Sequence, residues 1–165
     1  MVQNKTRIGL AIVLASSLAI PAEGLYYKWY PDPVGITTVC YGHTGADIDK
    51  NKTYTMDECM ALLSKDMAAA VITVDKCVPD LPIGILAAFG DAVYNMGPKI
   101  ACDPQKSTAA KLLKEGKFIE ACNQLPRWNK ARIGDRLRAL LGLTKRRTAE
   151  QEMCLKDATY QLNKI

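Results

Sequence analysis

Histidine is almost absent from this chain, which has 165 residues and only His43. Zinc amidases and zinc peptidases take several of their ligands from histidine, so a single imidazole argues against that chemistry. The motifs G-x-S-x-G, G-x-x-x-x-G-K-[ST] and G-x-G-x-x-G are also missing, which argues against common serine hydrolases and nucleotide-binding enzymes. Carboxylates remain as the candidates for acid–base chemistry, and His43 is expected to be structural, bonded to a carboxylate.

Repeats, low-complexity segments and interdomain linkers are absent too, and the length predicts one domain with an appended segment. The chain is 48% apolar and 24% charged, which is typical of a globular protein with a core. Residues 127–147 carry eight lysines and arginines against one aspartate. This stretch is either a solvated helical face or a surface attracted to an anionic wall polymer or phospholipid headgroups. Nucleic-acid binding is not expected, because no motif or interleaved aromatic residues accompany the charge.

No apolar run is long enough for a firm membrane anchor. Residues 8–20 are apolar apart from Gly9, Ser16 and Ser17, and Lys5 and Arg7 precede them. Thirteen helical residues span about 20 Å, short of the roughly 30 Å hydrocarbon core. The basic flank predicts an N-terminus in the cytoplasm and an exported body. The alternative is a buried helix of a cytosolic domain.

Three fates are open to an exported segment of this kind: cleavage, permanent anchoring, or insertion followed by release. Cleavage is the weakest, because the only small-residue site is 19–22 and its proline lies directly before the cut. Export agrees with the six cysteines, which are even in number, lie at least eighteen positions apart and form no C-x-x-C pair. Such cysteines favour disulfides in an oxidising compartment.

The remainder predicts an α+β fold with a small, sheet-containing N-terminal lobe and a larger helical C-terminal lobe. A hairpin is expected over residues 25–41 with its turn at 31–35, and residues 47–53 form a polar loop or a short third strand. A long helix over 55–77, begun by a Thr55–Glu58 capping box, bridges the lobes. An apolar helix over 82–96 forms the buried centre. Shorter helices are expected at 107–115, 117–125, 135–141 and 146–160.

Two carboxylates flank the start of this hairpin. Glu23 lies beside apolar residues, whereas Asp32 occupies a wetter Pro-Asp-Pro turn. Carboxyl groups in such different surroundings can divide the acid and base roles of glycoside hydrolysis across a cleft. Taken alone, the pattern is explained more simply by a solvated glutamate and an ordinary turn aspartate.

Residues 23–45 closely resemble the catalytic segment of the phage-type lysozymes, glycoside hydrolase family 24. That segment has a glutamate, eight residues, an aspartate, five residues, a threonine and then a glycine-histidine pair. Here these are Glu23, Asp32, Thr38 and Gly42-His43. Later landmarks extend the resemblance to about residue 155: Tyr94 to Gly97, Arg127-Trp128, Gly142-Leu143, Arg146-Arg147 and Glu150.

The resemblance implies an endolysin that hydrolyses the β-1,4 bond between N-acetylmuramic acid and N-acetylglucosamine in peptidoglycan, without metal or cofactor. Glu23 is the implied acid, while Asp32 and Thr38 hold the attacking water. Inversion then requires carboxyl groups about 6.5 to 9.5 Å apart. Tyr94, Thr108 and Asn123 are the implied glycan contacts, although Tyr94 suits the core equally well.

At its N-terminus and in its cysteines the chain is similar to the signal-anchor-release endolysins of phages of Gram-negative hosts. This implies export by the host machinery, tethering to the inner membrane through residues 8–22, and release into the periplasm for host cell lysis. Residues 1–22 are then the signal-anchor-release segment and 23–165 the catalytic domain, a monomer. Some members of that group are held inactive by a cysteine in the anchor that later exchanges disulfides, and this route is closed here because residues 1–22 contain no cysteine. We expect released residues 8–22 to pack on the C-terminal lobe and set Glu23 opposite Asp32.

Six cysteines allow 15 connectivities. We favour Cys77 with Cys102 around the central helix, Cys122 with Cys154 between C-terminal helices, and Cys40 with Cys59 by elimination, at about 2 to 4 kcal/mol each. Two rival functions remain. One is a lytic transglycosylase, which needs a glutamate but no water-holding aspartate, so Asp32 and Thr38 argue against it. The other is a non-catalytic periplasmic wall-binding or inhibitor module.

Overall fold

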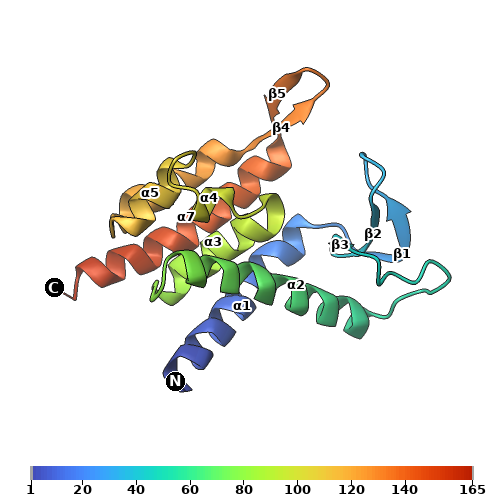
Figure 1. Cartoon of the computed structure of the whole chain (residues 1–165), viewed down its shortest axis with the longest axis horizontal. Coiled ribbons are helices and arrows are strands. Elements are labelled where there is room, and N and C mark those ends of the chain that lie inside the picture. Colours follow the sequence, from blue (N-terminus) through green and yellow to red (C-terminus); the bar gives the residue numbers. More distant parts are fainter. Residues whose placement is uncertain (1, 165) are drawn as a thin grey trace.

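The computed structural model describes residues 2–164 and divides into a small sheet lobe and a larger helical lobe (Figure 1). Helix α1 (Val2–Ala22) precedes a sheet of β1 (Tyr26–Pro31), β2 (Thr37–Cys40) and β3 (His43–Thr44). The helical lobe then follows, and its elements are α2 (Met56–Cys77), α3 (Ile83–Met96), α4 (Lys99–Cys102), α5 (Thr108–Lys114), α6 (Phe118–Cys122), a 3₁₀ turn (Leu125–Trp128), β4 (Lys130–Ile133), β5 (Arg136–Ala139) and α7 (Leu141–Leu162). The predicted α+β architecture is confirmed.

The sheet is antiparallel, in the order β1-β2-β3, and Thr38 of β2 pairs with Tyr30 on one side and Thr44 on the other. The third strand lies at 43–44, so the strand considered for 47–53 does not form. In that segment the Asp49 carboxylate accepts a hydrogen bond from the Asn51 amide at 2.9 Å, and the Asp49 amide donates to the Tyr54 hydroxyl at 3.0 Å. Local side-chain bonds of this kind compete with strand pairing.

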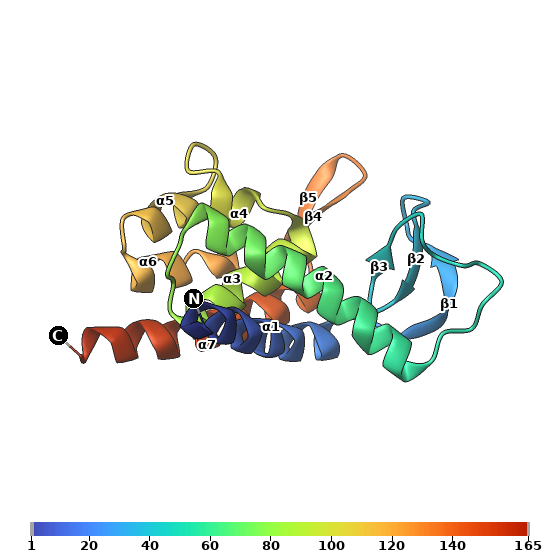
Figure 2. The ribbon, with the colours of Figure 1, turned by 60° about the horizontal axis from the view of Figure 1, so that its bottom comes forward.

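Helix α2 runs from the sheet lobe along the helical lobe (Figure 2). It begins with the predicted capping box, in which the Thr55 hydroxyl accepts from the Glu58 amide and the Glu58 carboxylate accepts from the Thr55 amide. One face of α2 packs on α3, the buried centre, where a side chain at Gly90 would lie 2.6 Å from Val71. Glycine thus allows the two helix backbones to approach closely.

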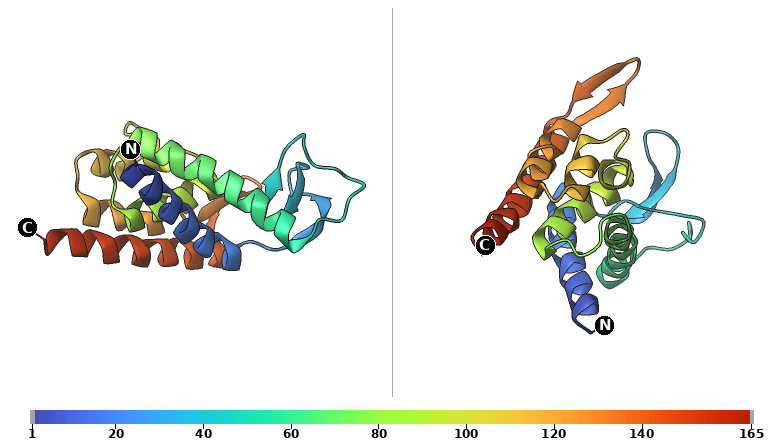
Figure 3. Two further views of the ribbon diagram at one scale, coloured as in Figure 1. Left: turned by 90° about the horizontal axis from the view of Figure 1, so that it is seen from below. Right: turned by 60° about the vertical axis from the view of Figure 1, so that its left-hand side comes forward.

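Helix α1 packs against α3 between α2 and α7 (Figure 3). Its contact face is a stripe of small residues at helical spacing, Ala11, Ala15 and Ala19, each fully buried. Large apolar side chains on the other side, including Val13, are exposed. Near its start, Arg7 forms an ion pair with Asp75 of α2 and donates a hydrogen bond to the Leu81 carbonyl at 2.8 Å.

The helix predicted over 135–141 is wrong, because β4 and β5 form an antiparallel hairpin there. Ile133 pairs with Arg136 across a two-residue turn, and Gly134 supplies a φ of 58° that glycine adopts without strain. The alternation of arginine with apolar residues over 136–139 has the period of a strand. The helix over 117–125 is shorter than predicted and ends at Cys122, while α4 was not predicted.

Three disulfides close within the body of the protein, and they are the pairs favoured in the sequence analysis. Cys40–Cys59 ties the sheet to α2, Cys77–Cys102 ties α2 to α4, and Cys122–Cys154 ties α6 to α7. All lie outside α1, so the position of α1 depends on packing and on the Arg7 contacts.

The packing of α1 can be tested with two leucine substitutions that add apolar volume to the same helix. Ala15→Leu forces a larger side chain into the buried contact with α3 and should destabilise the soluble protein by about 1 to 3 kcal/mol. Val13→Leu enlarges an exposed side chain and should change stability by less than about 0.5 kcal/mol. Thermal unfolding of both variants measures the difference. Equal melting temperatures would show that α1 is not packed on α3 in solution.

Candidate active site

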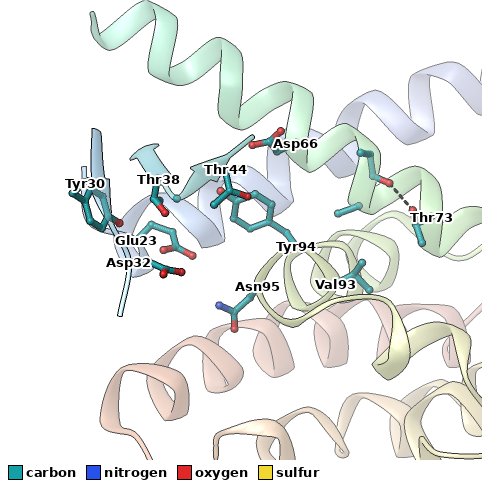
Figure 4. A pocket seen from close by; sticks show the side chains of 13 residues that line it. Glu23, Tyr30, Asp32, Thr38, Thr44, Asp66, Thr73, Val93, Tyr94 and Asn95 are labelled. Atoms are coloured by element: carbon teal, nitrogen blue, oxygen red, sulfur yellow. Dashed lines mark hydrogen bonds between the residues drawn. The ribbon is translucent and has the colours of Figure 1, made fainter. Parts of the chain in front are cut away.

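A cavity of about 540 Å³ opens between the sheet lobe and the helical lobe. Figure 4 shows Glu23, Asp32 and Thr38 on one side of it, facing Tyr94 and Asn95 of α3. Glu23 comes from the residue after α1, Asp32 from the β1–β2 turn and Thr38 from β2. The structure therefore brings together all three residues that the sequence predicts as catalytic.

Asp32 is held by the backbone of its own turn. Its Oδ1 accepts hydrogen bonds from the amides of Val34 at 2.9 Å and Ile36 at 2.8 Å. The Asp32 amide donates to the Ile36 carbonyl at 2.9 Å, which closes the turn. Within residues 2–164, Oδ2 has no hydrogen-bond partner, so this oxygen is available to a water or substrate in the cavity.

Thr38 and Tyr94 are positioned by hydrogen bonds to backbone carbonyls. The buried Thr38 hydroxyl donates to the Ile36 carbonyl at 3.0 Å, which leaves its oxygen free to accept a hydrogen bond from water. The Tyr94 hydroxyl donates to the Tyr41 carbonyl at 2.5 Å, so this side chain joins α3 to the sheet lobe. Burial, with the nearby Glu23 carboxylate, raises the pKa of Tyr94 and keeps it neutral.

Glu23 is held by an ion pair that the sequence analysis did not foresee. Arg146 of α7 donates from Nη1 to Glu23 Oε1 at 2.5 Å. Asp91 of α3 fixes the same guanidinium with two hydrogen bonds, from Nε at 2.9 Å and from Nη2 at 2.6 Å. Asp91 is fully buried, whereas the Glu23 side chain retains 26% exposure. Glu23 thus lies at the edge of a buried ionic network rather than among apolar residues only.

The network extends along α7 to Arg147 and Glu150, both fully buried. Arg147 Nη2 lies 2.7 Å from Glu150 Oε1 and donates to the Asn95 side chain at 2.9 Å. Burial raises the pKa of the Glu150 carboxyl, and the adjacent Asp91 acts in the same direction. A signal for this network was present in the sequence: Asp91 is the one carboxylate in a helix that is apolar nearly all round, and such a group needs a cationic partner.

His43 has the structural role expected from the sequence. Its Nδ1 lies 2.7 Å from Asp66 of α2 and its Nε2 lies 3.1 Å from Asp47. This pairing fixes the residue after Gly42, whose φ of 85° favours glycine. A side chain at Gly42 would lie 3.5 Å from Glu23 Oε2 and would narrow the cavity beside the carboxylate.

Two predicted glycan contacts lie apart from the cavity. Thr108 is exposed at the start of α5, and the exposed Asn123 accepts a hydrogen bond from Gln151 at 2.9 Å. Sequence reasoning also missed residues that do line the cavity, namely Tyr30, Thr44, Asp66, Ala69, Ala70, Thr73, Val93 and Asn95. They come from four elements, and only Asn95 lies within a motif named in the sequence analysis, the landmark from Tyr94 to Gly97.

The model of the phage lysozyme family matches residues 21–150, a segment that holds the cavity, its carboxylates and the whole ionic network. The chain belongs to the phage lysozyme family. The SAR-endolysin of Bacteriophage PS119 is 41% identical over 134 residues, which are 81% of this chain and 76% of that protein. The SAR-endolysin of Pseudomonas phage phiKMV is 31% identical over 157 residues, 94% of this chain and 95% of that protein.

Solved structures agree with the assignment to the phage lysozyme family. The muramidase domain of SpmX from Asticaccaulis excentricus superposes with a TM-score of 0.75 at 25% identity, covering 86% of this chain and 94% of that domain. This phage lysozyme is therefore an enzyme of the lysozyme class with the lysozyme fold, and peptidoglycan is the substrate that its family implies. The match over 157 residues to the phiKMV protein extends beyond the family model.

The His43 pair makes the stability of this phage lysozyme depend on pH. Burial lowers the pKa of the imidazole, but the hydrogen bonds to Asp66 and Asp47 outweigh it, so the pKa is raised. The stabilisation is therefore complete below the unfolded value of about 6.5 and is lost as pH rises through the folded pKa. His43→Gln should cost about 1 to 3 kcal/mol at pH 5.5 and less at pH 8.5. Urea unfolding at both values tests this, and a pH-independent difference would contradict it.

Proposed function

We propose that this phage lysozyme is an inverting muramidase that hydrolyses the β-1,4 bond between N-acetylmuramic acid and N-acetylglucosamine. The observation that carries the proposal is the meeting of Glu23, Asp32 and Thr38 in one cavity, with each side chain held by its own contacts. A volume of about 540 Å³ is within the range of ligand sites.

Glu23 acts as the general acid in this proposal. Its Oε1 is bound by Arg146, so the proton delivered to the leaving oxygen sits on Oε2, which faces Gly42. Asp32 Oδ2 accepts a proton from the attacking water, and the free lone pairs of the Thr38 hydroxyl orient that water on the opposite face of the sugar. Attack from the opposite face inverts the anomeric carbon.

Glycan contacts are proposed at Tyr94 in the cavity and at Thr108 and Asn123 farther along the helical lobe. Because Tyr94 already donates its hydroxyl proton to the Tyr41 carbonyl, it offers the glycan its ring and an acceptor oxygen. Thr108 and Asn123 lie beyond the lining of the cavity and suit more distant sugars of an extended strand.

The catalytic roles predict the effect of two isosteric substitutions. Glu23→Gln and Asp32→Asn should each lower muralytic activity by roughly 10² to 10⁴, because each removes one proton-transfer group. Glu152→Gln makes the same chemical change at an exposed position of α7 and should leave the rate unchanged. Activity is measured on purified sacculi, and the first-formed anomer is read by NMR.

Other outcomes of that experiment favour a different function. A 1,6-anhydro product would identify a lytic transglycosylase, and retention of configuration would contradict inversion. Wall binding and a biological effect that survive both substitutions would favour a non-catalytic wall-binding or inhibitor module.

We further propose that residues 1–22 are a signal-anchor-release segment that controls this site by position. Residues Gln3–Ala22 are long and apolar enough to cross a membrane, with a mean hydropathy of 1.3. A helix in the bilayer cannot also bury Ala11, Ala15 and Ala19 against α3, so the inserted and packed states exclude each other. Glu23 follows α1 directly, and its amide still donates to the Ala19 carbonyl at 2.9 Å. Insertion of α1 therefore draws Glu23 away from Arg146.

In this scheme the host exports the chain with its N-terminus in the cytoplasm, and the body reaches the periplasm while α1 holds it at the inner membrane. Release returns α1 to the helical lobe and completes the site before host cell lysis. The Arg7 contacts with Asp75 and the Leu81 carbonyl stabilise only the packed state. Cleavage before Glu23 would remove the helix that positions the acid.

Asp75→Asn tests release, because it weakens the packed state without changing α1 itself. We expect the ratio of soluble to membrane-bound protein to fall, by up to about fivefold for an ion pair worth up to about 1 kcal/mol, while intact soluble protein keeps its activity. Asp57→Asn, an exposed change on the same helix, is the control. The proposal predicts activity in the soluble fraction and none in the membrane fraction. Full activity of membrane-bound protein, or of a product that begins at Glu23, would contradict it.

A further inference from the structure

The β4–β5 hairpin, residues 130–139, projects away from the helical lobe in Figure 1, in Figure 2 and in the right panel of Figure 3. It carries four cations and the single carboxylate Asp135, a net charge of +3. Within residues 2–164 none of the four cationic side chains forms an ion pair or hydrogen bond, and all are exposed: Lys130, Arg132, Arg136 and Arg138. By contrast, Arg146 and Arg147, from the same basic stretch, are buried in the ionic network.

Large apolar side chains accompany these free cations. Ile133, Leu137 and Leu141 are 51%, 64% and 73% exposed. In the hairpin register Arg132 pairs with Leu137 and Ile133 pairs with Arg136, so each face presents an aliphatic side chain beside an arginine. Ile133 and Leu137 lie next to the turn, at the outer end of the hairpin. An isolated two-stranded ribbon is only marginally stable in water, so contact with a partner can stabilise this one.

We propose that the hairpin docks on a membrane surface rich in anionic phospholipids. Cations attract the headgroups, and aliphatic side chains between them enter the boundary of the acyl region. Arginine suits this place because its stem lies along apolar surface while the guanidinium stays at the phosphates. Asp135 at the turn opposes deep insertion, so the contact is confined to the headgroup layer.

The composition favours a lipid surface over a glycan. Residues 130–139 contain no aromatic side chain, whereas isolated aliphatic side chains next to arginine suit an interface between water and hydrocarbon. None of the hairpin residues lines the cavity that contains Glu23. The hairpin is thus a second surface, with a ligand different from that of the active site.

The biological meaning of this surface rests on the proposed release from the membrane, although the binding itself does not. A released enzyme that docks through its hairpin stays beside the bilayer and works on the wall from the inner side. Docking also supplies a contact with the membrane that is independent of α1. In Figure 1 the N-terminal end of α1 lies at the bottom of the molecule, whereas the hairpin lies at the top.

Vesicle co-sedimentation of the full-length soluble protein tests the proposal. We expect binding to vesicles of phosphatidylethanolamine with phosphatidylglycerol, little binding to phosphatidylcholine, and weakening by salt. Arg132→Gln/Arg136→Gln should reduce the affinity by about 25-fold, at roughly fivefold for each cation. The charge-matched Lys114→Gln/Lys156→Gln variant, changed at exposed positions of α5 and α7, should lose about twofold or less.

A second pair separates charge from apolar contact. Ile133→Ser/Leu137→Ser should weaken binding to the anionic vesicles while leaving its dependence on salt unchanged. All variants keep α1, so any insertion of that helix contributes equally. Equal losses in the hairpin and control variants would overturn the proposal. If the hairpin variants lost binding to purified sacculi but still bound the vesicles, the proposal would be overturned in favour of a wall polymer as the ligand.

Hydrolysis of soluble glycan fragments is measured in parallel, so that a failure of the docking proposal can be told from a failure of the proposed muramidase function. The hairpin variants should hydrolyse such fragments at the wild-type rate, because they alter no residue of the cavity. If wild-type protein hydrolyses nothing while the hairpin variants still lose more vesicle binding than the control variant, the muramidase proposal fails and the docking surface stands. If it hydrolyses glycan but binds no vesicle, the docking surface fails.

Discussion

The ion pair between Glu23 and Arg146 joins the beginning of the chain to its last helix, and the position of Glu23 opposite Asp32 depends on it. Arg146 is buried together with Asp91, and a buried guanidinium is tolerable only when its charge is matched and its donors are used. Asp91 uses two of these donors, while Glu23 uses another. Because the three residues come from α3, α7 and the end of α1, the site exists only when these helices are assembled.

Under the proposed insertion and release, helix α1 has to satisfy two demands that usually conflict. A helix with apolar side chains on every face is stable in a bilayer, but in water these side chains have to be buried against the protein. The stripe of alanines lets one side approach α3 closely, while Val13 and its exposed neighbours remain in water. Small residues suit both environments, because they also pack well between helices in lipid. A stripe of leucines would insert more firmly and pack worse.

The parts of this protein that were predictable from sequence are those governed by local signals. The capping box of Thr55 and Glu58 predicted the start of α2, and the Pro-Asp-Pro turn placed Asp32 at the end of β1. The spacing of Glu23, Asp32 and Thr38 pointed to one cavity through its resemblance to a family. The partner of Glu23 was not predictable in this way, because Arg146 lies 123 residues away and looked like one more member of a basic stretch.

The same stretch shows why residues 135–141 misled the prediction. Arginine, leucine and alanine are good helix formers, but Gly134 and Asp135 permit a tight turn, and the alternation after them pairs with residues 130–133. Helix propensity is a property of single residues, whereas the hairpin depends on pairing between two segments. The four arginines and lysines of the hairpin were consequently grouped with Arg146 and Arg147, although the structure gives the two sets opposite environments.

The three disulfides lie within residues 40–154 and leave α1 free of covalent restraint. The cross-linked part of the chain can therefore form its disulfides and fold while α1 is still in the membrane. Under the proposed release, activation is then a unimolecular step, in which a helix already tethered to its receptor groove finds it at high effective concentration. The half-time of activation would then be set by the escape of the helix from lipid and would be the same at low and at high enzyme concentration.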